Sequence, residues 1–148
     1  MSKFLFKAKR KNTEEWITGG TIVQFEDDGI RSFYMPQLNE KCDCIHEDVT
    51  DDILGFENCR FYKIDENTLC RFIGLYDKNK VKIWEKDIVL ISGEEDYFQI
   101  LWDDDTARFI MKGDGLTVDF DNYWSKETEV IGNVFDNSKL LEVSDEEY

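Results

Sequence analysis

The chain has 148 residues, of which 41% are hydrophobic and 14% aromatic, and its formal net charge at pH 7 is −15. This composition supplies a core for one domain or two small lobes and excludes a disordered acidic chain, which would be poor in aromatic residues. The excess of carboxylates disfavours binding to nucleic-acid phosphates and to anionic membranes, because both require Lys and Arg. We therefore expect neither a nucleic-acid partner nor a membrane partner.

The N-terminal third consists of short runs typical of β-strands. Residues 3–8 alternate apolar and polar side chains, and residues 16–25 continue this pattern around the pair Gly19-Gly20. These two runs predict a β-hairpin with a bulge at the glycines. Residues 30–35 predict a further strand, which we expect to end at Pro36, the only proline.

Residues 37–58 form the least regular part of the sequence, with no clean period of two or of 3.6. Strand character returns over residues 56–64. We therefore predict an N-terminal β lobe over residues 1–64, containing an irregular connection at 37–58, and a second domain over residues 65–148.

The irregular connection contains a possible metal site. Cys42, Cys44 and His46, with Cys59 further along, have the residue types of a Cys₃His zinc site. A single residue separates each of the first three ligands, whereas structural zinc sites normally use a Cys-x₂₋₄-Cys pair. We therefore treat these four residues as weak metal candidates and expect no cofactor. The cysteines are expected to be reduced thiols, as in a cytoplasmic protein.

The central stretch from residue 71 to residue 91 organises the second domain. It begins with an apolar run around Gly74, and a glycine inside a strand indicates a bulge or a close backbone approach. Residues 77–80 are polar and predict a turn. The four consecutive apolar residues 88–91 predict a strand buried on both faces.

The remaining residues predict more short strands. Residues 97–111 predict a hairpin whose turn is Asp103-Asp104-Asp105, and residues 113–115 predict the next turn. Residues 116–120 alternate as in a half-buried strand, and residues 129–135 predict the last one. Short strands at this close spacing favour a barrel or a sandwich over βαβ units.

Several of these stretches resemble the YopX family. Residues 72–89, Phe-Ile-Gly-Leu-Tyr-Asp-Lys-Asn-Lys-Val-Lys-Ile-Trp-Glu-Lys-Asp-Ile-Val, are similar to the family signature aromatic-Thr-Gly-Leu-x-Asp-Lys-Asn-Gly-x-x-Ile-aromatic-Glu-Gly-Asp-Ile-Val. Residues 129–142 resemble its closing motif and residues 65–69 its Asp-Pro-x-Thr-Val element, while residues 3–8 resemble its opening strand more loosely. The chain departs from the family at Lys80 and Lys86, where glycine is usual, and at Ser138, where proline is frequent.

The resemblance implies a phage or prophage protein that is largely β, with a small SH3-like barrel at the C-terminal end. With the N-terminal β-hairpin lobe predicted from the residues, the expected fold is mainly β with little helix. The resemblance implies no activity. The residues that carry the motifs are expected to be structural; they are Gly74, Leu75, Asp77, Asn79, Ile83, Trp84, Asp87, Ile88, Val89, Gly132 and Asn133.

Aromatic residues in this domain are candidates for partner contact. Trp84, Tyr123 and Trp124 could form part of a binding face, although a small β domain also needs aromatic residues in its core. Trp124 lies in a loop-like stretch and is the best candidate for an exposed contact.

No nucleophile, base and orienting group occur at a spacing that indicates catalysis, so we expect no enzyme and no catalytic residue. The first hypothesis is a cytoplasmic, non-enzymatic module that binds a protein partner or itself as a homo-oligomer. A second is an acidic mimic of nucleic acid that blocks a host DNA-binding protein, based on the charge of −15. A third is a hydrolase that uses clustered carboxylates, which would require them to converge in a pocket.

Overall fold

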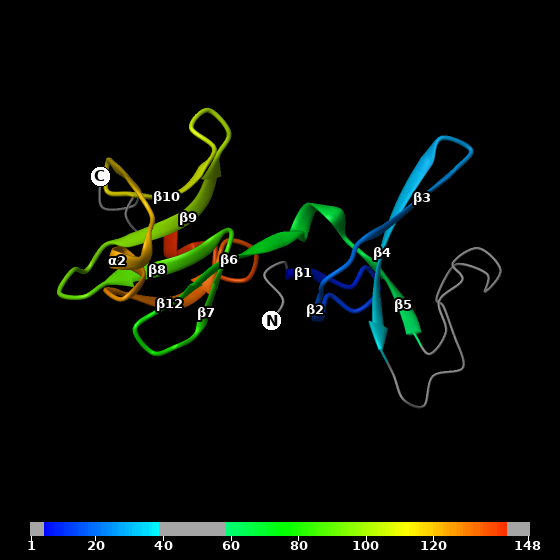
Figure 1. The fold of residues 1–148 in the computed structure, drawn as a ribbon, viewed down its shortest axis with the longest axis horizontal. Helices are drawn as coiled ribbons and strands as arrows, with labels where there is room; N and C mark the ends of the chain where they lie inside the picture. The colour runs from blue at the N-terminus through cyan, green and yellow to red at the C-terminus, as the bar shows by residue number, and fades with distance from the viewer. Residues whose placement is uncertain (1–4, 39–58, 142–148) are drawn as a thin grey trace. The chain divides into compact units, whose positions relative to one another are not determined.

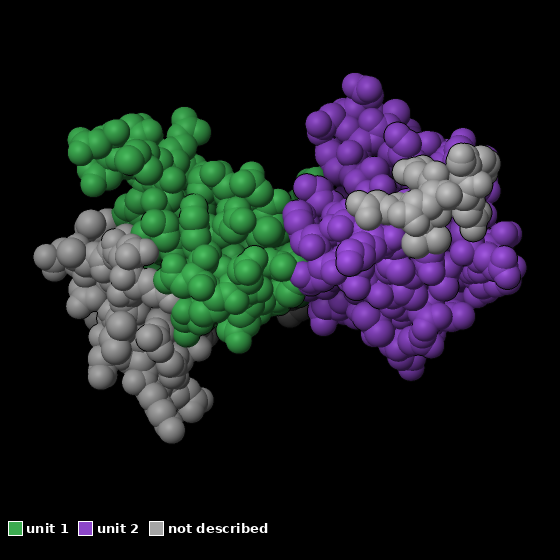
Figure 2. All heavy atoms as spheres, turned by 180° about the vertical axis from the view of Figure 1, so that it is seen from behind, with its two compact units in different colours: residues 1–71 green, residues 72–148 purple. Residues whose placement is uncertain are grey.

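The computed structural model describes residues 5–38 and 59–141, and the chain divides into two compact units, residues 1–71 and 72–148 (Figure 2). The described residues are mainly β-strand, arranged in antiparallel sheets (Figure 1). This confirms the prediction of a mainly β protein. In these ranges no helix is both long enough and apolar enough to cross a membrane.

Unit 1 contains a hairpin and a three-stranded sheet. The hairpin is formed by β1 (Phe6–Lys9) and β2 (Trp16–Gly19). The sheet has the order β3-β4-β5, with β3 (Val23–Asp27), β4 (Ile30–Leu38) and β5 (Cys59–Ile64). Ala8, Met35 and Ile64 form one buried cluster, which joins a residue of the hairpin to residues of the sheet.

The predicted bulge at Gly19-Gly20 is wrong. β2 ends at Gly19, and β3 pairs with β4 rather than with β2. Gly19 is instead a point of close approach, because a Cβ atom there would lie 3.0 Å from side-chain atoms of both Met35 and Gln37. The Gln37 amide donates to the Thr18 carbonyl at 2.7 Å. The glycine therefore allows β2 to pack closely against β4.

The predicted end of a strand at Pro36 is also wrong, because β4 continues to Leu38. Pro36 lies opposite Phe61 in the pairing with β5, whereas the pairing with β3 ends at Tyr34. One side of the strand therefore has no partner at the proline. Proline has no N–H to donate, so it is tolerated in a strand where one side has no partner strand.

Residues 65–71 belong to unit 1, whereas the sequence suggested a boundary after residue 64. The Asp65 N–H donates to the Lys9 carbonyl, and the Lys9 N–H donates to the Thr68 hydroxyl in the 3₁₀ turn η1 (Glu66–Thr68). Cys70 then pairs with Lys7. These bonds to β1 hold the segment in the first unit.

Unit 2 contains most of β6 (Cys70–Tyr76) together with β7 (Lys82–Trp84), which pair antiparallel. It also contains a five-stranded sheet with the order β11-β10-β9-β8-β12. The strands are β8 (Asp87–Ile91), β9 (Tyr97–Asp103), β10 (Arg108–Gly113), β11 (Leu116–Asp119) and β12 (Thr128–Asn133), and the short helix α2 (Asn122–Ser125) precedes the last strand.

The hairpin predicted over residues 97–111 is confirmed as β9 and β10. The predicted closed barrel is not observed, because no sheet of the described residues closes on itself and the five-stranded sheet ends at β11 and β12. The core of unit 2 is formed by Ile83, Val89, Phe98, Ile100, Met111 and Phe120. Ile88 and Val89 are both fully buried, so β8 is covered on both faces at its start, whereas Leu90 and Ile91 are half-buried.

Candidate functional site

The first feature of the site is a bulge in β6. Gly74 has a φ of +85°, and the pairing of β6 with β7 shifts register between Phe72 and Tyr76. No atom lies within 4 Å of the position that a Cβ would take at Gly74. The glycine is therefore needed for its left-handed backbone conformation rather than for close packing, as the sequence indicated for a bulge.

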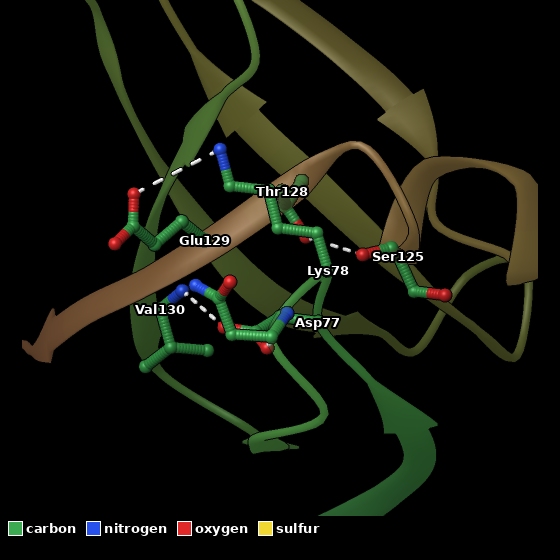
Figure 3. Close-up of polar contacts among 7 residues, drawn as sticks. Asp77, Lys78, Ser125, Thr128, Glu129 and Val130 are labelled. Atoms are coloured by element: carbon green, nitrogen blue, oxygen red, sulfur yellow. Dashed lines mark hydrogen bonds and ion pairs between the residues drawn. The ribbon is translucent and has the colours of Figure 1, made fainter.

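The turn that follows β6 is held by Asp77, which is only 5% exposed. One carboxylate oxygen accepts the N–H groups of Asn79 and Val81, at 2.8 and 2.9 Å. The other oxygen accepts the N–H of Val130 in β12 at 2.9 Å, as Figure 3 shows. A single carboxylate thus closes the turn and fixes it to the last strand, and hydrogen bonds to a charged acceptor are among the stronger ones in proteins.

A second set of contacts brings the same turn close to α2. The Lys78 N–H donates to the Thr128 carbonyl at 3.0 Å, and the Thr128 hydroxyl donates to the Ser125 carbonyl (Figure 3). The Lys78 ammonium lies 4.0 Å from a carboxylate oxygen of Glu129. The end of β6 and the short helix therefore lie side by side, although they are far apart in the sequence.

A hollow of about 390 Å³ lies between these two segments. Three lysines line it, and three other polar side chains contribute to its wall; they are Lys78, Lys80, Lys126, Tyr76, Asn122 and Ser125. A volume of this size falls within the range of small-ligand sites, about 300–1,000 Å³. No local pattern in the sequence indicates this hollow, because tertiary contacts bring its two walls together.

The charge of the hollow is opposite to that of its unit. Unit 2 has eight basic and 19 acidic residues, yet three of its lysines surround this one depression. Among the described residues that line it, the only carboxylate is Asp77, and both of its oxygens accept backbone N–H groups. The hollow is therefore a local region of positive charge in an acidic molecule.

The second motif turn joins β7 to β8. Asp87 is 2% exposed and accepts the N–H of Trp84 at 2.8 Å. Lys86 has a φ of +68°, close to the φ of +66° at Lys80. The two lysines that replace the usual glycines therefore both adopt the left-handed conformation. The Lys86 ammonium lies over the ring of Phe135, 5.4 Å from its centroid.

The closing motif forms a compact turn after β12. The Asn133 side chain accepts the N–H groups of Phe135 and Asp136, both at 2.9 Å. The Asn133 N–H in turn donates to the side-chain oxygen of Asn137 at 3.1 Å. A Cβ on Gly132 would lie 2.4 Å from the Asn137 side-chain oxygen. Glycine is therefore required there by close packing.

The other motif residues lie in or beside the core. Ile83, Ile88 and Val89 are fully buried, and Leu75 is half-buried against the core cluster. The backbone N–H of Asn79 is used by Asp77. The motif residues that the structure describes therefore build turns and the core, and they do not converge on one reactive group.

The three aromatic candidates differ in exposure. Trp84 is 8% exposed, and Trp124 is half-buried against the core. Tyr123 is 69% exposed, and its ring meets that of Trp124 edge-on at 5.2 Å. The sequence indicated a loop-like stretch here, whereas the structure has the short helix α2, which Asp121 caps by accepting the N–H groups of Tyr123 and Trp124.

The acidic turns lie at opposite ends of β9. Asp96 precedes this strand, and the repulsion of Asp114 in the first place, with smaller contributions from burial, a hydrogen bond to Asp114 and the nearby glutamates, raises the pKa of Asp96 above its ordinary value of 3.8. Asp103 is the last residue of the strand, and its carboxylate accepts the Asp105 N–H and the Thr106 hydroxyl. A seven-residue strand is about 23 Å long, so these carboxylates do not form one stripe.

The weak metal candidates Cys42, Cys44 and His46 lie outside the described residues, and the side chain of Cys59 is also not described. Within residues 5–38 and 59–141, no group of three or more His, Cys, Asp and Glu side chains has an arrangement that could hold a metal ion.

Comparison with known proteins supports the family resemblance of the motifs that form these turns. A family model described as YopX protein matches residues 6–142. The chain belongs to the YopX family. This YopX-family chain also resembles the crystal structure of protein EF1440 from Enterococcus faecalis, with 19% sequence identity and a TM-score of 0.56 over 95% of this chain and 99% of that chain. At that identity the likeness concerns the fold alone. No curated protein matches the chain.

Proposed function

We propose that this YopX-family protein is a non-enzymatic interaction module of phage or prophage type, which binds a protein partner or a second copy of itself. The proposal depends on one observation, the concentration of exposed apolar side chains around the lysine-lined hollow. Exposed apolar surface that is rimmed by polar groups is typical of interaction sites.

Unit 2 has four large hydrophobic residues that are strongly exposed in the described part of the chain. Tyr76 is 46% exposed and lines the hollow. Val81 is 48% exposed and follows Lys80, while Tyr123 is 69% exposed and follows Asn122. Three of the four therefore line the hollow or adjoin a residue that lines it. Tyrosine is also enriched in protein interfaces.

The two other hypotheses receive less support from the geometry. An acidic mimic of nucleic acid would need a continuous row of carboxylates, whereas the two acidic turns flank β9 at its two ends. A hydrolase would need convergent free carboxylates. Asp65 and Glu66 both line a small hollow of unit 1, but Asp65 uses its side chain to cap η1.

We further propose that unit 2 is SH3-like in its strand order. The support is the meander from β8 to β11, after which β12 returns to pair with β8.

A bacterial cytoplasmic location is also proposed, since the structural relative EF1440 comes from a bacterium, Enterococcus faecalis.

The test compares two surface variants of the full chain. In the first, Val81→Ser and Tyr123→Ser are combined; in the matched control, Leu116→Ser alters the fourth exposed residue, which is 56% exposed in β11. Native mass spectrometry over a concentration series and affinity capture from a bacterial lysate would measure self-association and partner binding.

We expect the wild-type chain and the Leu116→Ser variant to give the same complex, and the double variant to lose it. A strictly monomeric chain that captures no partner would contradict the proposal. So would a double variant that forms the same complex with unchanged yield, because the exposed residues around the hollow would then have no part in the contact.

A further inference from the structure

We propose that the lysine-lined hollow of unit 2 binds a short, carboxylate-rich peptide segment of a protein partner. This inference rests on the proposed interaction function and identifies the chemistry of the segment that is recognised. It depends on three features of the hollow, which are its unpaired cations, its backbone conformation at Lys80 and its aromatic wall.

The three lysines of the hollow differ in their ion pairs. Among the described residues, neither Lys80 nor Lys126 forms an ion pair, whereas Lys78 lies 4.0 Å from Glu129. Like charges around a small depression repel one another, and an anion placed between them removes that repulsion. The two free ammonium groups are therefore suited to one or two carboxylates supplied from outside.

The backbone at Lys80 adds an independent observation. Lys80 holds a left-handed φ of +66°, which glycine adopts more easily than a residue with a Cβ. Lys86 has nearly the same φ, but its ammonium lies over the ring of Phe135. Lys80 is instead one of the residues that line the hollow. Unfavourable backbone conformations that persist tend to occur at functional sites.

The wall of the hollow is fixed and partly aromatic. The Tyr76 ring meets Phe72 edge-on at 5.5 Å, and the Lys82 ammonium lies over it at 5.6 Å. This exposed ring offers an apolar surface beside the two free lysines. A peptide that carries an apolar side chain next to its carboxylates would use both features.

The surroundings of the hollow favour a peptide over a nucleic acid. A nucleic-acid strand carries a phosphate at every nucleotide, so it would meet the acidic surface of unit 2 beyond the hollow. A peptide can place one or two carboxylates in the hollow and continue with neutral residues. The total of 19 acidic against eight basic residues in unit 2 therefore restricts the ligand to a locally acidic one.

The experiment measures fluorescence anisotropy of a fluorescein-labelled peptide of four glutamates with the full chain at low salt. Each of the variants Lys80→Gly and Lys126→Gln should weaken binding by about fivefold, the value of one exposed ion pair. Two matched controls, Lys86→Gly and Lys112→Gln, remove a left-handed lysine and an exposed lysine of β10 outside the hollow. They should change the affinity by less than about twofold.

The Lys80→Gly variant also excludes unfolding as an explanation, because glycine relaxes the backbone and should raise the melting temperature while it weakens binding. Failure of the glutamate peptide to bind would overturn the proposal, and so would an equal loss in the two controls. Tighter binding of an eight-nucleotide thymidine strand would also overturn it. If a captured partner still binds the Lys80→Gly variant, the role of the hollow is refuted but the interaction function is not. If no complex forms at all, the interaction function itself is refuted.

Discussion

The two motif turns of unit 2 have the same construction and different uses. Each contains a buried aspartate that accepts at least one backbone N–H and a lysine in the left-handed conformation, Asp77 with Lys80 and Asp87 with Lys86. In the second turn the lysine side chain packs over an aromatic ring, and in the first it lines a hollow. The same backbone motif therefore leaves Lys80 available for contact, whereas Lys86 is packed against a ring.

The largest expected effect is on the aspartate of the first turn. Asp77→Ala leaves three backbone N–H groups without their acceptor, and we expect the free energy of unfolding to fall by about 3 kcal/mol. Urea unfolding monitored by tryptophan fluorescence measures it. The control, Asp121→Ala, removes the exposed cap of α2 and should cost about 1 kcal/mol. An equal loss in both variants would show that Asp77 is not the main support of this turn.

The closing motif supports the second turn, since Asn133 pairs with Asp87 and the Val134 N–H donates to the Lys86 carbonyl. Gly132→Ala places a Cβ against the Asn137 side chain, and we expect a loss of about 2 kcal/mol in urea unfolding. The double variant with Asn137→Ala should recover part of that loss. If Gly132→Ala is neutral, the close approach is not required.

Lys80 and Lys86 have nearly the same φ, so replacing each by glycine compares their side chains directly. Lys80→Gly should stabilise the chain by about 1 kcal/mol, because a left-handed residue with a Cβ is unfavourable by that order. Lys86→Gly should stabilise it less, since it also removes a cation–π contact of about 0.5–1 kcal/mol. Thermal unfolding of both variants measures the difference. A larger gain at Lys86 would contradict the different uses assigned to the two side chains.

The smallest expected effect on stability is at Asp96, whose carboxylate is repelled by that of Asp114. The neighbouring Asp114 raises the pKa of Asp96 in the folded chain above its ordinary value of 3.8. Protonation of Asp96 therefore contributes stability that is fully present below pH 3.8. That stability is lost as the pH rises through the raised pKa of Asp96 in the folded chain. Asp96→Asn should stabilise the chain slightly at pH 7, and the gain should disappear below pH 3.8 and shrink in high salt. A gain that is independent of pH would contradict the repulsion.

Much of the fold follows from local patterns. The strands β9 and β10 and the turn at residues 77–80 were predictable, since alternation and turn-forming residues act over a few positions. The choice of which strands pair with one another was less predictable. The pattern around Gly19 indicates a strand and a break, but it does not indicate that β3 pairs with β4. α2 has only four residues, too few for a helical period to appear in the sequence.

The candidate site was less predictable than the fold. The sequence pointed to aromatic residues, and of these Tyr123 is strongly exposed whereas Trp84 is buried. It contained no sign of the hollow, because Lys80 and Lys126 belong to segments far apart in the sequence, which bonds between the first turn and β12 bring together. Such a site depends on tertiary contacts, which no local pattern encodes.

The central claim is that the turn around Lys80 and the helix α2 form the contact surface of the molecule. Amide chemical-shift mapping by NMR, with the isotope-labelled full chain and the four-glutamate peptide, tests it most directly. We predict shifts that are concentrated in residues 74–80 and 122–126, the two walls of the hollow. The absence of shifts there, or shifts confined to the acidic turns at residues 94–96 and 103–105, would contradict the account.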